Sequence, residues 1–367
     1  MKKNWEFDKN FVRSLLKRAN ELLDSSLISQ QDKECLLIDK ITFESFLNNN
    51  FSMLEEDNEY VNKNLEELIN ITLRYMKKFY YLIGPDLMDW IVELNKARIF
   101  PYFDDELAND FINAPEISKM SMDEQAELTI KNYEKNSKIL LPEVKKLIYN
   151  TSQIQMVLDD EITSFCHYTE IIRLPFIIVN PNNGFHVLNH EVDHGLHYYL
   201  GNKFPHLYSE LSPILNELLC IDFYVNDNGK LKLDDFSRRF EDANIFLEEM
   251  ADFFTLIKEF SKKDFRISYG EFVDACERLI LVPEEALKDY LVEEILDDSG
   301  IEESMIYTLS YLKALELRQE LLIKKDDIMN ILERFMSLKK FEFDINPNSY
   351  NIYNNYVEEM LQRVRKR

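Results

Sequence analysis

The stretch "FIIVNPNNGFHVLNHEVDHGLHYYL", residues 176–200, decides how this chain is expected to fold. It opens with a run of β-branched and aromatic residues, which is typical of a buried strand. The Pro, Asn and Gly of "NPNNG" (180–184) then predict a turn. The histidine-rich residues that follow are expected to be helical up to Gly201, because glycine favours helix ends. The stretch therefore predicts a strand, a turn and a helix in succession.

The predicted helix carries the pattern H-E-x-x-H, in which His190 and His194 are four residues apart. Positions i and i+4 share one face of an α-helix, so both imidazoles can reach one metal ion at about 2.0–2.1 Å. Glu191 is rotated by about 100° from His190, beside the open coordination position. There it can take a proton from a metal-bound water. All six histidines fall within residues 167–206, which favours a metal site over chance scatter.

A catalytic zinc site needs a third protein ligand, and two His with one Glu is a common set. Glu217 is the first candidate, because it lies on a separate predicted helix, 212–224, behind a loop long enough to fold back on His194. Glu210 is the rival. It precedes Pro213 and is expected to lie outside the helix, where its side chain would be aimed less rigidly.

Other polar side chains near the motif have alternative interpretations. His197 shares the face of His194 and is expected to pack beside the site rather than bind the ion. Asp193 is either a solvated helix residue or a carboxylate that orients a ligand imidazole. Ordinary polar roles are expected for His186 and His206, while His167 lies on a predicted strand where it could line a substrate cleft.

Most of the remaining chain has apolar residues at the spacings of three and four that predict amphipathic helices. These helices are expected at 11–23, 64–83, 140–158, 212–224, 234–260 and 303–322, with short strands at 162–169 and 173–180. Pro175 favours an edge position for the second strand. The fold class is therefore mainly α with a small β element before the histidine helix. We expect a helical region at 1–160 and a catalytic region at 161–367, or one continuous domain.

The charge composition of the chain indicates which classes of partner are not expected. The chain has 43 Lys and Arg against 67 Asp and Glu, a net charge of -24, which repels phosphate backbones and anionic lipid. Nucleic acid and membranes are therefore not expected as partners. The N-terminus has no apolar signal segment, and four scattered cysteines suit reduced thiols. These features predict a cytoplasmic protein and do not indicate an oligomeric state.

Residues 174–224 resemble the core of the oligoendopeptidase F and thimet oligopeptidase family of zinc metallopeptidases. The family has a strand ending in Asn, a turn with Gly, an H-E-x-G-H helix continuing A-L-H (G-L-H in this chain), and a Y-S-E segment followed by the ligand Glu. The resemblance implies that His190, His194 and Glu217 bind one Zn²⁺ ion and that Glu191 is the general base. It also implies a helical metallopeptidase fold, with two lobes around a channel that admits short peptides and with part of its wall formed by residues 1–160.

The chain also departs from the family pattern. Asp193 stands where the family has Gly before the second His, and no His follows residue 206, so the family's downstream oxyanion-binding His is absent. The segment "MIYTLSYLKALELRQ" (305–319) resembles the family's late Tyr-rich helix. Its Tyr307 and Tyr311 lie one turn apart and are either hydrogen-bond donors to a tetrahedral intermediate or core aromatics.

The expected function is a zinc-dependent endopeptidase that hydrolyses short unstructured peptides, with Glu191 as the general base. The strand at 175–180 is expected to hold the substrate backbone by β-addition. Two alternatives stay open. The chain could be an inactive relative that binds peptides or a partner protein, or its zinc could be structural, with His197 or Glu210 completing four protein ligands.

Overall fold

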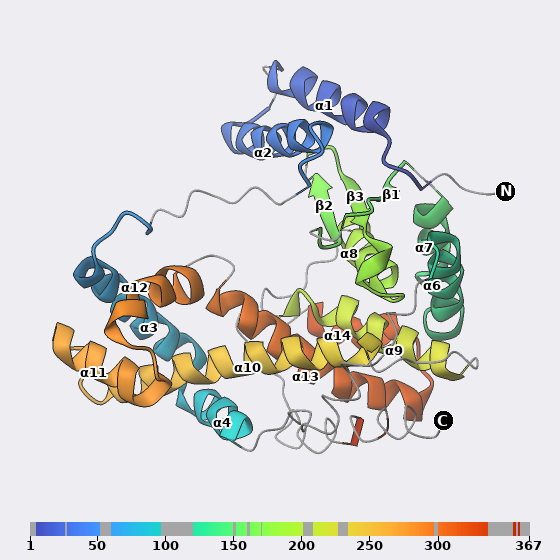
Figure 1. Cartoon of the computed structure of the whole chain (residues 1–367). Helices are drawn as coiled ribbons and strands as arrows, with labels where there is room; N and C mark the ends of the chain where they lie inside the picture. Colours follow the sequence, from blue (N-terminus) through green and yellow to red (C-terminus); the bar gives the residue numbers. More distant parts are fainter. Residues whose placement is uncertain are drawn as a thin grey trace.

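The fold is seen in a computed structural model, which is mainly helical with one small sheet (Figure 1). This confirms the fold class predicted from the sequence. The residues described are 5–25, 28–51, 60–96, 120–149, 152–159, 162–169, 171–200, 208–226, 234–296, 300–336, 355–356 and 359. Within them, no helix is both long enough and apolar enough to cross a membrane.

The sheet has three strands in the order β1-β3-β2. β1 (Ile154–Met156) pairs with β3 (Leu174–Val179) in parallel, and β2 (Phe165–Thr169) pairs with β3 antiparallel. β3 is therefore the central strand. It ends at Val179, and a short 3-10 turn (Pro181–Asn183) leads into the histidine helix. The predicted order of strand, turn and helix is confirmed.

Three details of the sheet differ from the sequence predictions. β3 is not an edge strand, but its pairing with β1 starts only at Ile177, so Pro175 needs no backbone donor on that side. The helix predicted over 140–158 ends at Tyr149, and β1 follows it, because this short strand is stabilised by pairing with a distant segment. Since β3 is paired on both sides, it has no free edge for β-addition over 177–179.

Helices cover both faces of the sheet. Side chains of β3 alternate between the two faces: Phe176 and Ile178 pack toward α1 and α2, while Ile177 and Val179 pack toward α6, α7 and α8. The helices concerned are α1 (Lys9–Leu23), α2 (Gln30–Leu47), α6 (Met122–Asn136), α7 (Leu141–Tyr149) and α8 (Val187–Leu200). The sheet thus fixes the position of α8, which carries the H-E-x-x-H pattern.

The remaining helices form a second, larger core (Figure 1). They are α3 (Leu65–Ile83), α4 (Pro85–Lys96), α9 (Leu211–Asn226), α10 (Asp234–Ser261), α11 (Tyr269–Ile280), α12 (Glu284–Asp289), a π-helical turn (Tyr290–Ile295), α13 (Ile301–Lys324) and α14 (Ile328–Met336). α13 packs against both α9 and α10, and α9 also packs against α8. α9 therefore joins the helical core to the sheet-bearing part.

A glycine sets how closely α8 approaches the sheet. A Cβ atom at Gly195 would lie 3.0 Å from Ile177 Cδ1, 3.2 Å from Leu147 Cδ2 and 3.3 Å from Pro175 Cβ. These separations are shorter than ordinary carbon contacts, so a side chain at 195 would push the neighbouring Ile177, Leu147 and Pro175 side chains away. The missing side chain lets α8 lie directly on β3 and α7.

Candidate metal centre

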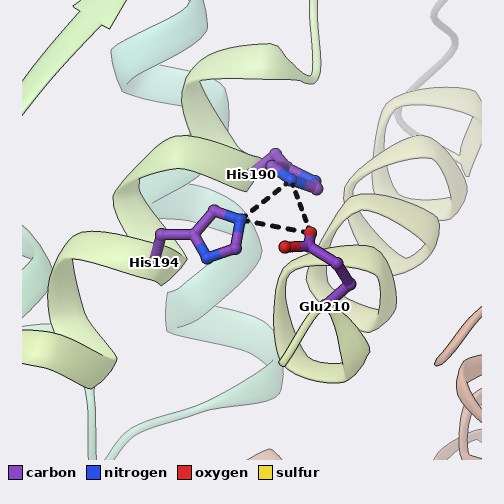
Figure 2. A group of neighbouring side chains, drawn as sticks. All are labelled: His190, His194 and Glu210. Atoms are coloured by element: carbon purple, nitrogen blue, oxygen red, sulfur yellow. Dashed lines mark hydrogen bonds and ion pairs between the residues drawn. The ribbon is translucent and has the colours of Figure 1, made fainter. Parts of the chain in front are cut away.

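Three polar side chains from α8 and from the start of α9 converge on one point (Figure 2). Nε2 of His190 lies 3.2 Å from Nε2 of His194 and 3.3 Å from Oε2 of Glu210. Nε2 of His194 lies 3.2 Å from the same Glu210 oxygen. One atom from each residue therefore forms a nearly equilateral triangle. We call these three residues the metal group.

The size of this triangle fits a bound cation. Ligand atoms held at about 2.0–2.1 Å from a tetrahedral zinc ion are about 3.3–3.4 Å apart. The three observed separations, 3.2, 3.3 and 3.2 Å, match that edge length. Oε2 of Glu210 is buried and has no well-aligned hydrogen-bond donor, which leaves its lone pairs available to a cation. Two imidazoles and one carboxylate also form a donor set that zinc prefers.

The pKa values of the three side chains also indicate that the site attracts positive charge. Burial lowers the pKa of His190, but its interactions with the carboxylates of Glu210, Glu217 and Glu191 outweigh burial and raise the pKa to about 10. Burial is likewise outweighed at His194, whose pKa is raised by the Glu210 carboxylate. Burial raises the Glu210 pKa, yet the two histidines lower it well below its usual range. The carboxylates around His190 and His194 therefore stabilise a positive charge at this position.

Glu217, predicted from the sequence to be the third ligand, lies behind His190. Its Oε2 is 3.2 Å from Nδ1 of His190, the ring nitrogen that faces away from the metal group. Its Oε1 is 3.5 Å from Nε2 of His186. The carboxylate is almost fully buried. The structure therefore brings Glu210, and not Glu217, to the Nε2 atoms of the histidine pair.

The start of α9 explains this difference. Sequence signals at Ser212 and Pro213 predict that the helix begins at 212 or 213, but it begins at Leu211. The carbonyl of Glu210 accepts the first helical hydrogen bond, from the Ile214 N–H at 3.0 Å. Glu210 thus lies just outside the helix, as the sequence predicts, but as its N-cap residue it is held in place rather than loosely aimed. Seven residues are about two helical turns, so the Glu210 and Glu217 side chains leave α9 on the same side.

His186 belongs to the site, although the sequence suggested an ordinary polar residue. It is buried, and its Nε2 approaches Glu217. Gly184 makes room for it, because a Cβ there would lie 2.8 Å from His186 Cε1, and the glycine has a φ of 137°. A glycine two residues before a histidine was the only signal in the sequence, and it is a weak one. The result is a row of side chains from His186 through Glu217 to His190.

Glu191 is buried on α8, directly after His190. Its charge interacts with those of His190 and His194 and with the thiol of Cys166 on β2. Burial and this carboxylate together raise the Cys166 pKa well above its usual value. The outer edge of β2 pairs with no other strand among the described residues. The charge of Glu191 therefore acts on both the metal group and strand β2.

The two candidate tyrosines lie in the large core, on α13. The ring of Tyr307 stacks on Phe246 of α10, with centroids 5.1 Å apart and planes inclined by 14°. Tyr311 is buried and interacts electrostatically with Tyr356 near the C-terminus. These contacts agree with packing roles for both residues. A hydrogen bond from either one to a reaction intermediate stays a prediction.

Tyr356 was not singled out in the sequence. It is buried, and its pKa is raised well above the usual value by burial and by the charges of neighbouring groups, which include Glu217. The guanidinium carbon of Arg318 lies 4.4 Å from the centre of its ring. Arg318 in turn donates two hydrogen bonds, at 2.6 and 2.7 Å, to the carboxylate of Asp222 on α9. An ion pair therefore fixes this tyrosine against the helix that carries Glu217.

The remaining candidates lie apart from the metal group. Asp193 is buried and contacts His197 instead of a ligand imidazole. His167 lies 3.0 Å from Asp39 of α2 through its Nε2 atom, so it interacts with the helix that covers the sheet. His206 lies outside the described residues.

No known family model matches the sequence, and no curated protein does either. Solved structures do show similarity. A Bacillus anthracis protein provisionally described as an oligoendopeptidase F is 13% identical, with a TM-score of 0.42, over 91% of this chain and 64% of that one. A Chlamydophila abortus protein provisionally described as a peptidase is 15% identical, with a TM-score of 0.40, over 95% and 62%. PZ peptidase A with an inhibitor is 13% identical, with a TM-score of 0.40, over 95% and 67%. The chain thus spans less than two thirds of the length of the first two proteins.

Proposed function

We propose that this chain is a zinc-dependent peptidase whose metal ion is held by His190, His194 and Glu210. The observation that carries the proposal is the triangle of donor atoms, with sides of 3.2, 3.3 and 3.2 Å. It has the size that one tetrahedral ion requires. A buried carboxylate, Glu191, lies next to it in the sequence position that H-E-x-x-H metallopeptidases use for their base.

When bound, a zinc ion would lower the pKa of a water molecule and polarise the scissile carbonyl. The chain's own part of the reaction is proton transfer. Glu191 accepts the proton of the attacking water and passes it to the leaving amine, which then departs as a neutral group. Because Glu191 is only 6% exposed, little bulk water competes for its carboxylate.

In this proposal Glu217 orients the imidazole of His190. With Nδ1 of His190 protonated, Glu217 accepts its hydrogen bond at 3.2 Å, which directs the lone pair of Nε2 toward the metal group. Carboxylates that hold ligand imidazoles in this way fix the tautomer and raise the basicity of the ligand. Glu217 therefore supports metal binding without contacting the ion.

Short unstructured peptides are the proposed substrates. Strand β2, an outer strand of the described sheet whose Cys166 interacts with the charge of Glu191, replaces β3 as the strand to which a peptide backbone would add. Tyr307 or Tyr311 would donate a hydrogen bond to the tetrahedral intermediate. We further propose that residues 1–160 form part of a channel wall, that 161–367 carry the chemistry, and that the protein works in the cytoplasm.

The decisive variant is Glu191→Gln, which keeps the shape of the side chain but removes the base. We expect one zinc ion per chain, as in the wild type, and loss of peptide cleavage by several orders of magnitude. Metal content is measured by elemental analysis, and turnover with a library of quenched fluorescent peptides. Cleavage by the variant at the wild-type rate would show that Glu191 is not the base.

An inactive relative that binds peptides is the second candidate. The absence of a histidine after residue 206 and the carboxylate of Asp193 at the family's Gly position favour it. Wild-type protein that binds one zinc ion but cleaves no peptide in the library would support it. A purely structural zinc is less favoured, because His197 is engaged by Asp193 and Ser212 and the described residues offer three converging donors.

A further inference from the structure

A buried polar cluster behind the metal group connects α8 to α9. Nε2 of His197 lies 3.2 Å from Oδ2 of Asp193, one turn earlier on α8, and 2.7 Å from the hydroxyl oxygen of Ser212 on α9. All three side chains are buried. His197 therefore bridges the two helices that supply the proposed ligands. We call Asp193, His197 and Ser212 the clasp.

The clasp is also fixed from its other side. Oδ1 of Asp193 accepts hydrogen bonds from the hydroxyl of Tyr133 on α6, at 2.5 Å, and from the side-chain amide of Asn216 on α9, at 2.6 Å. Burial and the Asp193 charge raise the pKa of Tyr133 well above its usual value, so its hydroxyl keeps the proton it donates. A buried carboxylate with several partners holds one geometry, because losing any partner leaves a buried charge less well satisfied.

Each end of the clasp lies next to a proposed metal ligand. Asp193 directly precedes His194, and Ser212 follows Glu210 by two residues. Over such short distances a helix behaves as a rigid body, with a rise of about 1.5 Å per residue. The clasp and the metal group therefore span the same gap between α8 and α9. The clasp thus contacts each helix one or two residues from His194 and Glu210, whose Nε2 and Oε2 atoms are 3.2 Å apart.

We propose that the clasp is a positioning device that keeps the metal group preorganised for its ion without touching it. The inference rests on the proposed function, because it takes His190, His194 and Glu210 as the ligands. A site that is preorganised does not need to order its ligands when the ion binds, and it binds more tightly for that reason. Loss of the clasp should weaken metal binding and distort the coordination geometry, even where the fold survives.

The test uses full-length variants His197→Gln and Ser212→Ala, the double variant, and Ser137→Ala as a matched control. Ser137 is equally buried, and its hydroxyl donates to Asp327 at 2.9 Å, outside the α8–α9 pair. Zinc affinity is measured by competition with a chromophoric chelator. The visible spectrum of the cobalt-loaded protein reports coordination geometry, and thermal unfolding reports stability.

We expect each single clasp variant to bind zinc about 10- to 100-fold more weakly than the wild type, the range seen when supporting partners of metal ligands are removed. The cobalt spectrum should shift in both. The double variant should be no weaker than the worse single one, because both substitutions break the same bridge. Ser137→Ala should lower the unfolding temperature while leaving affinity and spectrum unchanged.

Three results would overturn the clasp. The variants could bind zinc with wild-type affinity and spectrum and lose only stability, as the control does. The effects of the two substitutions could add in the double variant, which would mean that they act independently. If either result accompanies normal zinc binding and peptide cleavage by the wild type, the clasp alone is refuted. Wild-type protein that binds no zinc or cobalt would refute the proposed function and the clasp together.

Discussion

The assignment of the third ligand can be tested by comparing Glu210→Gln with Glu217→Gln. Both substitutions keep the side-chain volume and remove one buried negative charge, and both residues lie on the same side of α9. They differ in what they contact: Glu210 faces Nε2 of both histidines, whereas Glu217 faces Nδ1 of His190. The pair of variants therefore separates a metal ligand from a residue that orients one.

The expected sizes follow from these contacts. Structural zinc sites bind with about 10–16 kcal/mol, so each of four ligands contributes about 2.5–4 kcal/mol. Glu210→Gln should thus weaken zinc binding about 100- to 1,000-fold, at 1.4 kcal/mol per factor of ten. Glu217→Gln should weaken it about 10- to 100-fold, as for other carboxylates that support a ligand imidazole.

Zinc affinity is measured at pH 7.5 by competition with a chromophoric chelator, together with the cobalt spectrum. Loss of Glu210 should change the number of protein donors and alter the cobalt spectrum strongly, whereas loss of Glu217 should leave the donor set intact. The reasoning is refuted if Glu217→Gln has the larger effect on both affinity and spectrum. That outcome would restore the ligand set expected from the sequence resemblance.

Three further predictions concern pH and stability. The His190 pKa is raised to about 10, so zinc must displace a proton from this imidazole when it binds. The zinc affinity should therefore rise by about tenfold per pH unit below pH 10. Calorimetry in two buffers should detect the released proton. Burial and the charge of Glu248 raise the Asp252 pKa to about 6, above its unfolded value, so this residue costs stability once the pH exceeds that range. Asp252→Asn should stabilise the fold by about 1 kcal/mol at pH 8, allowing for solvent screening, and should change it little at pH 4, as followed by urea unfolding. Arg318→Met leaves the buried Asp222 carboxylate unpaired and should cost about 3–5 kcal/mol in the same assay, whereas Arg318→Met with Asp222→Leu should recover much of that loss.

The sequence predicts the helix that carries the metal pair, because a strand, an Asn-Pro turn and H-E-x-x-H are local signals. The start of α9 was less predictable. Ser212 and Pro213 are good capping residues, but the helix begins at Leu211, and a shift of this size decides whether Glu210 is held at the helix end or lies in the loop. Two glutamates seven residues apart share a helix face, so spacing alone could not choose between them.

Features that depend on distant partners were missed. β1 is three residues long and follows an amphipathic helix, so its own residues give no strand signal apart from the pairing with β3. His186 lies before the histidine helix, and its buried position depends on a contact with Glu217, which is 31 residues later on α9. For Asp193 the sequence left open a solvated position or a contact with a ligand imidazole; instead it is buried, because Tyr133 and Asn216, from two other helices, hold its carboxylate.

Asp193 and Gly195 are separated by about 200° around α8 and therefore face nearly opposite directions. One side of the helix meets the sheet through a position with no side chain, and the other meets α6 and α9 through a buried carboxylate whose Oδ1 accepts two hydrogen bonds. Substitutions on the two sides of α8 should therefore destabilise it for different reasons. Added bulk at 195 would crowd the side chains of β3 and α7, while loss of the carboxylate at 193 would remove the acceptor of the buried Tyr133 hydroxyl and Asn216 amide. On the Gly195 side of α8, tolerance should depend on the volume of the substituted side chain. On the Asp193 side it should depend on whether the new side chain can accept hydrogen bonds, whatever chemistry the histidines perform.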